Sequence, residues 1–184
     1  MSKMSPAEKL DSIALNSPPI SSSSGLFMLD TNIISDLMRG TASRASASCR
    51  RAIQKGEVTT FCTSVVVQCE LLFGLTKRPS DKLQAAYVIE MSKLQVLPLT
   101  PDIAAHYAEL RTQLEALGTL IGPNNALIAA HALAMNATLV TGEAEFLRVP
   151  GLRVENWLAL EEASASRAGL KTSQNKQKTK QINL

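Results

Sequence analysis

The stretch Leu26-Phe27-Met28-Leu29-Asp30-Thr31-Asn32 decides the fold. Its four apolar residues are typical of a short buried strand, and an apolar pattern of helical period begins directly after Asp30. The same alternation of short apolar runs and longer helical segments continues along the chain, which is typical of βα units. We therefore predict an α/β fold in which helices flank a central, mostly parallel sheet.

The same pattern places the individual elements. Strands are expected at residues 26–29, 58–61, 95–99, 138–141 and 152–154, and helices at 32–39, 43–55, 64–75, 81–94, 101–117 and 125–135. Thr100 should cap the helix that Pro101 begins, since proline suits the first helical position, and Gly118 should follow its last turn. Gly122 and Pro123 should form a turn before the next helix.

The chain is expected to hold one folded domain between two irregular ends. It has 184 residues, and 45% of them are hydrophobic, which suits one domain with a substantial core. Residues 1–25 are rich in serine and bury too little apolar surface to offset the entropy of ordering, so we predict a disordered leader. We place the domain at 26–158 and a basic, disordered tail at 159–184.

Several protein classes are excluded by what the sequence lacks. No apolar run approaches the ~20 residues of a membrane span, and the N-terminus lacks the apolar core of a secretory signal, so a cytoplasmic protein is expected. Cys49, Cys62 and Cys69 are odd in number and lack CxxC spacing, which disfavours a disulfide framework or a zinc site. The glycine-rich and GxSxG motifs of nucleotide-binding proteins and serine hydrolases are absent as well.

Net charge does not by itself indicate a nucleic-acid partner. The formal charge is +3, but the tail carries five basic residues, and removing them leaves −2 for the rest of the chain. A second basic stretch follows the first strand. It either contacts RNA phosphates or is an ordinary solvated face of a helix. Its members are Arg39, Arg44, Arg50, Arg51 and Lys55.

Acidic side chains at the ends of strands are the candidates for chemistry, because ligands bind beyond the carboxyl ends of parallel strands. Asp30 ends the first strand, where it is either a ligand or a helix cap. Glu70 lies on an otherwise apolar helix face, so it needs a cation or a cleft unless that face meets water. Glu143 follows the fourth strand, with Glu145 as the alternative.

The remaining polar candidates are weaker. Asn125 precedes an apolar helix, and taken alone it is most simply a helix N-cap. His106 and His131 lie inside helices without a partner at metal-ligand spacing, so surface or packing roles are expected for both.

Four segments together resemble the PIN-domain VapC ribonucleases. They are residues 28–34, 69–75, 121–133 and 139–157, so the resemblance covers about 26–158. It implies an endoribonuclease toxin that hydrolyses RNA, with initiator tRNA as a candidate substrate, and that is neutralised by a cognate antitoxin and forms a homodimer. Matching the motifs places the site on Asp30, Glu70, Asn125 and Glu143, around Mg²⁺ or Mn²⁺.

One of these four positions departs from the family pattern. Active relatives carry an acid where this chain has Asn125, and an amide brings an oxygen but no charge. Mg²⁺ prefers oxygen ligands and is usually held by one or two carboxylates, so weaker metal binding and slower cleavage are expected. The alternative function is a PIN scaffold that binds antitoxin or RNA without cutting.

Overall fold

The computed structural model describes residues 25–57 and 60–159. The leader expected at 1–25 and the tail expected at 159–184 therefore lie outside the described residues, apart from Gly25 and Ala159. Five strands form one parallel sheet in the order β3-β2-β1-β4-β5. They are β1 (Leu26–Leu29), β2 (Thr60–Ser64), β3 (Gln95–Leu97), β4 (Thr138–Val140) and β5 (Arg153–Glu155).

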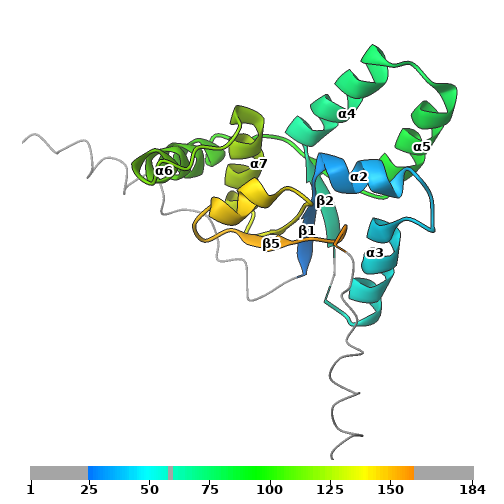
Figure 1. The fold of residues 1–184 in the computed structure, drawn as a ribbon, viewed down its shortest axis with the longest axis horizontal. Coiled ribbons are helices and arrows are strands. Elements are labelled where there is room, and N and C mark those ends of the chain that lie inside the picture. Colours follow the sequence, from blue (N-terminus) through cyan, green and yellow to red (C-terminus); the bar gives the residue numbers. More distant parts are fainter. Residues whose placement is uncertain (1–24, 58–59, 160–184) are drawn as a thin grey trace, which may run out of the picture.

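Helices cover both faces of this sheet (Figure 1). The connections β1-β2 and β2-β3 run one way along the sheet and β3-β4 runs back, so right-handed crossovers put their helices on opposite faces. The first group is α2 (Thr31–Leu37), α3 (Arg44–Gln54), α4 (Val65–Lys77) and α5 (Asp81–Met91); the second is α6 (Ile103–Ala116) and α7 (Pro123–Ala134). The α/β fold with helices flanking a parallel sheet is confirmed.

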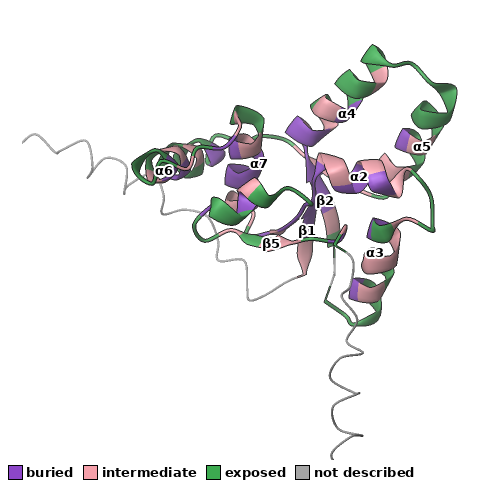
Figure 2. Ribbon diagram, in the orientation of Figure 1, coloured by how far each residue is buried: buried purple, intermediate pink, exposed green. Residues whose placement is uncertain are grey.

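The core lies where the central strands meet these helices (Figure 2). Met28 in β1 and Leu139 in β4 are fully buried, as neighbouring strands covered on both faces should be. Near β5, the buried Trp157 ring packs 5.7 Å from Phe27 and 6.0 Å from Phe61 between ring centroids. In the described part of the chain, no helix is long and apolar enough to cross a membrane.

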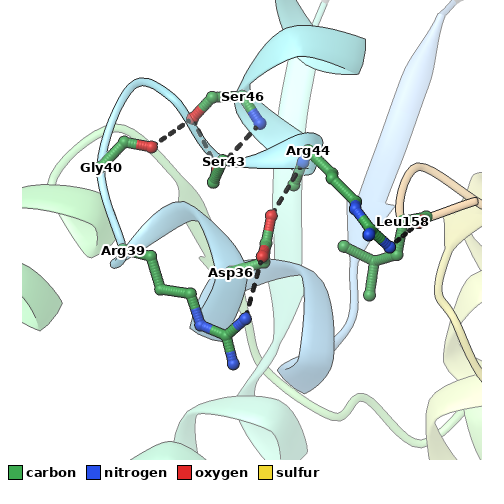
Figure 3. Close-up of polar contacts among 8 residues, drawn as sticks. Asp36, Arg39, Gly40, Ser43, Arg44, Ser46 and Leu158 are labelled. Carbon is green, nitrogen blue, oxygen red and sulfur yellow. Dashed lines mark hydrogen bonds and ion pairs between the residues drawn. The ribbon is translucent and has the colours of Figure 1, made fainter. Parts of the chain in front are cut away.

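A buried aspartate joins the first two helices (Figure 3). Asp36 of α2 accepts a hydrogen bond from the backbone N–H of Ala45 at 2.9 Å and pairs with Arg39 at 3.4 Å. Ser43 caps α3 by accepting from the N–H of Ser46. The first turn of α3 is therefore stabilised partly by its own cap and partly by a carboxylate from the neighbouring helix.

Several predicted element bounds are wrong in detail. The second strand extends to Ser64, because its last residues pair in register with β3, and residues 58 and 59 of the predicted strand lie outside the described residues. Helix α6 begins at Ile103 after Asp102, so Pro101 lies in the preceding turn and not in the helix. Gly118 does follow its end, with a φ of +64° that suits glycine. The short 3₁₀ helix η1 (Ala144–Arg148) was not predicted.

Candidate active site

Asp30 directly follows the central strand β1, at the place where the order of strand addition reverses. From β1 the chain adds β2 and β3 on one side of this strand, and after crossing back it adds β4 and β5 on the other side. Ligands of open parallel sheets bind at such a switch point in the strand order. The Asp30 carboxylate is buried and accepts from the Thr31 N–H at 2.7 Å, the Asn32 amide at 2.6 Å and the Thr141 hydroxyl at 2.6 Å. It therefore caps α2 and also faces the end of β4.

Burial and nearby charge both act on this carboxyl group. Desolvation raises the pKa of Asp30 above its usual value, while the hydrogen bonds from Thr141 and Thr31 oppose the rise. The negative charges of Glu143 and Glu70 raise this pKa further, so both lie close enough to interact with Asp30. Acids far apart in the sequence thus share one region of the fold.

Glu70 reaches the same region from α4, whose first turn follows β2. Its two carboxylate oxygens accept from different segments: the Thr31 hydroxyl donates to Oε2 at 2.5 Å, and the Asn124 amide donates to Oε1 at 2.9 Å. The side chain is half-buried. The contact with Asn124 joins α4 to the start of α7, so Glu70 does not simply face water.

Asn125 is not the N-cap of its helix. Helix α7 begins at Pro123 after Gly122, which places Asn125 inside the first turn, because proline at the first helical position already fixes the start. The Asn125 amide donates to Glu143 Oε2 at 2.8 Å and also to Glu145 Oε1 in a shorter contact. One amide therefore bridges two carboxylates.

Glu143 and Glu145 both accept a hydrogen bond from the Asn125 amide. Glu143 leads into η1, its N–H donates to the Thr141 hydroxyl at 3.1 Å, and Glu145 lies in the first turn of η1. Glu143 remains the predicted fourth position, and Glu145 joins the group as a second carboxylate at Asn125. The sequence signal for it was its spacing of two residues from Glu143.

A continuous set of hydrogen bonds thus connects all four predicted positions. It runs from Glu70 through Thr31 to Asp30, and from Asp30 through Thr141 to Glu143 and Asn125. None of the carboxylates in it forms an ion pair with a basic side chain among residues 25–57 and 60–159. Amide and hydroxyl groups supply their hydrogen bonds instead.

This set of oxygen donors suits a hard divalent cation, which takes carboxylate, hydroxyl and amide oxygens and keeps several waters. Within the described ranges, however, no three His, Cys, Asp or Glu side chains stand together as a ready metal site. Asn124 and Asn125 donate to the carboxylate oxygens that a cation would otherwise attract. An amide is the weaker ligand here, since it carries no charge.

The two histidines lie apart from this set. His131 is buried in α7, where its Nδ1 is 2.9 Å from the Ser64 hydroxyl, and burial lowers its pKa. His106 is exposed on α6. Both positions agree with the packing and surface roles expected from the sequence.

The basic stretch is largely engaged within the protein. Arg44 donates to the backbone carbonyl of Leu158 (Figure 3), Arg50 donates to that of Thr41, and Arg39 and Lys55 form ion pairs with neighbouring acids. These contacts favour a structural role for the basic residues over a role in binding RNA phosphates.

Known proteins are similar to this chain in sequence and in fold. Residues 27–152 match the PIN domain family. A protein named ribonuclease VapC2, from Rickettsia felis, is 42% identical over 100 residues, which is 53% of this chain and 75% of that protein. A protein named tRNA(fMet)-specific endonuclease VapC, from Shigella flexneri, is 35% identical over 134 residues, which is 71% of this chain and 97% of that protein.

A solved structure agrees with these sequence matches. The crystal structure of VapBC2 from Rickettsia felis, bound to a DNA fragment from the promoter, superimposes with a TM-score of 0.65 and 35% identity. The match covers 72% of this chain and 98% of that one.

Proposed function

The chain belongs to the PIN-domain family and to its VapC ribonucleases, and from that premise we propose that it is the endoribonuclease toxin of a type II toxin–antitoxin pair. The family resemblance expected from the sequence is confirmed. One observation supports the activity most strongly: carboxylates from β1, α4 and the β4–η1 segment converge at the switch point of the sheet without a basic partner in the described ranges. A cation bound among these carboxylates would offset their mutual repulsion.

We propose Mg²⁺ or Mn²⁺ as that cation, held by Asp30, Glu70, Asn125 and Glu143. A divalent ion bound there would lower the pKa of a bound water and stabilise negative charge on a phosphodiester. Thr31 and Thr141 position the carboxylates, since their hydroxyls donate to Glu70 and Asp30 respectively. With only an amide at position 125, this chain should bind the ion more weakly than a variant with an acid there.

The substrate proposed is RNA, with initiator tRNA the first to test, because a relative is named for that activity. The experiment compares Mg²⁺-dependent cleavage of initiator tRNA and bulk RNA by the natural chain, Asn125→Asp, and Asn125→Asp combined with Asp30→Ala. We expect the single variant to cut fastest and the double variant not to cut. If none cuts where a related nuclease does, the scaffold function replaces the enzyme.

The partners proposed are a cognate antitoxin and a second copy of the chain. A cavity of about 450 Å³ lies among α2, α3 and α5, with apolar walls that include Leu37, Ile53, Phe61 and Ile89. Ile53 and Ile89 remain more than half exposed, which an apolar antitoxin segment would relieve. Co-purification with an antitoxin that Ile89→Asp abolishes, and a dimeric mass by light scattering, would support these two assignments.

A further inference from the structure

A second cavity borders the candidate active site. It measures about 230 Å³ and is lined by Thr141, Gly142, Glu143, Ala144, Leu147, Val154 and Asn156. Thr141 and Glu143 also belong to the carboxylate set, so the two sites share a wall. The other wall includes Leu147, whose side chain is 72% exposed although the neighbouring Phe146 is fully buried. The large apolar side chain of Leu147 is therefore exposed to solvent beside the candidate active site.

The far wall of this cavity is held firmly. Trp157 is buried against Phe27, and its backbone carbonyl accepts from the Ser48 hydroxyl at 3.2 Å. The carbonyl of Leu158 accepts from Arg44 (Figure 3). Asn156 is exposed and directly precedes these two residues, so their contacts hold its backbone in place.

The amide of Asn156 has a fixed orientation and an available donor. Its Oδ1 accepts from the N–H groups of Leu158 at 2.9 Å and Ala159 at 3.1 Å. Within the described part of the chain its Nδ2 donates to no protein acceptor. An amide whose oxygen is engaged in a turn presents only N–H groups to a ligand, so it selects a ligand that carries an acceptor.

We propose that this cavity is a nucleobase subsite that receives one unpaired RNA base beside the phosphate to be cut. Leu147 and Val154 pack against the faces of the base, and Asn156 Nδ2 donates to a carbonyl on its edge. The inference rests on the proposed RNA cleavage and adds a residue that contacts the base. Proteins that read RNA by sequence bind unpaired bases in this way, on apolar faces and polar edges.

Size and charge both favour a base over other parts of the RNA. The volume equals that of about eight waters at ~30 Å³ each, which suits one ring system and is below the ≈300–1,000 Å³ of sites for larger ligands. Glu143 lines the cavity, so a phosphate would meet a like charge there, whereas a base is neutral. The carbonyl oxygens of uracil and the ring nitrogens of adenine can both accept from the Asn156 amide, so this donor should distinguish RNA that carries a base from RNA that carries none.

The test measures, by fluorescence anisotropy, the preference for hexauridylate over a ribose-phosphate hexamer that carries no bases, in Ca²⁺ in place of Mg²⁺. The unchanged chain should bind hexauridylate about fivefold more tightly, the effect of one hydrogen bond. Asn156→Asp keeps the oxygen that accepts from Leu158 and Ala159 but replaces the donor by an acceptor, so this preference should shrink. Leu147→Ala should weaken the hexauridylate complex several-fold and leave the complex with the base-free hexamer unchanged.

Two matched control variants separate the loss of a specific contact in the cavity from the general effects of an added charge or a lost surface leucine. Asn136→Asp adds the same charge at the opposite end of β4, and Leu117→Ala removes an exposed leucine at the end of α6; neither should change the preference. If RNA is bound and cut while Asn156→Asp keeps the full preference for hexauridylate over the base-free hexamer, the subsite is refuted and the nuclease stands. If no form binds RNA and Asn125→Asp does not cut, the proposed function and the subsite both fail.

Discussion

Replacing Asn125 by aspartate should make the stability of the protein depend on divalent metal. In the natural chain the Asn125 amide donates to Glu143 at 2.8 Å and to Glu145. A carboxylate at that place would put like charges about 2.8 Å apart, a repulsion of about 6 kcal/mol at an effective dielectric of 20. Glu143 is exposed and can rotate away, so solvent and relaxation should reduce this to on the order of 1 kcal/mol.

The lost hydrogen bonds add to this penalty. Hydrogen bonds to a charged group contribute about 1.5–3 kcal/mol each when well formed, and partial exposure lowers that value here. We therefore expect Asn125→Asp to lose about 1–3 kcal/mol of unfolding free energy in EDTA. For a domain of this size that is a fall in Tm of about 4–12 °C.

Divalent metal should reverse the effect. A cation held between the introduced carboxylate and its acidic neighbours removes the repulsion, and at a hundredfold excess over its Kd it stabilises the fold by about 2.7 kcal/mol. Thermal unfolding in EDTA and in a Mg²⁺ series measures both parts, with Asn136→Asp as the matched control, because it makes the same change at a site where Arg153 already donates to the side chain. An Asn125→Asp protein as stable as the natural chain in EDTA, or no more responsive to Mg²⁺, would refute the reasoning.

Three further predictions concern groups outside the site. Asp36→Ala should cost about 1–3 kcal/mol, because the buried N–H of Ala45 loses its acceptor; urea unfolding measures this, and a loss below about 0.5 kcal/mol would contradict it. Burial lowers the pKa of His131 in the folded protein, so the unfolded chain binds the proton more readily and stability should fall as pH drops below about 6.5. A Tm that falls equally in His131→Gln between about pH 7.5 and 5.5 would exclude this source. Burial raises the pKa of the Cys62 thiol to about 12, whereas Cys69 is exposed, so a thiol reagent at about pH 8 should label Cys69 quickly and Cys62 only after unfolding, as peptide mass spectrometry can show.

The sequence alone determined the features that depend on local pattern. Strand β1 and its terminal carboxylate were located correctly, because four apolar residues followed by Asp30 and a helical period are a local signal. The alternation of strands and helices likewise fixed the α/β class and the parallel sheet. The family motifs then predicted four site positions, which stay a proposal and which the structure brings into one region at one end of the sheet.

Other features were decided only by tertiary packing. The end of β2 at Ser64 follows from its pairing with β3, and the sequence of β2 by itself does not indicate that register. Asn124 meets Glu70 across 54 positions because α4 and α7 converge beyond the sheet, and Glu145 reaches Asn125 because a 3₁₀ turn follows β4. Local propensity acts over a few residues, whereas these contacts depend on where whole elements pack, so the amide bridges and the neighbouring cavity could be found only in the folded chain.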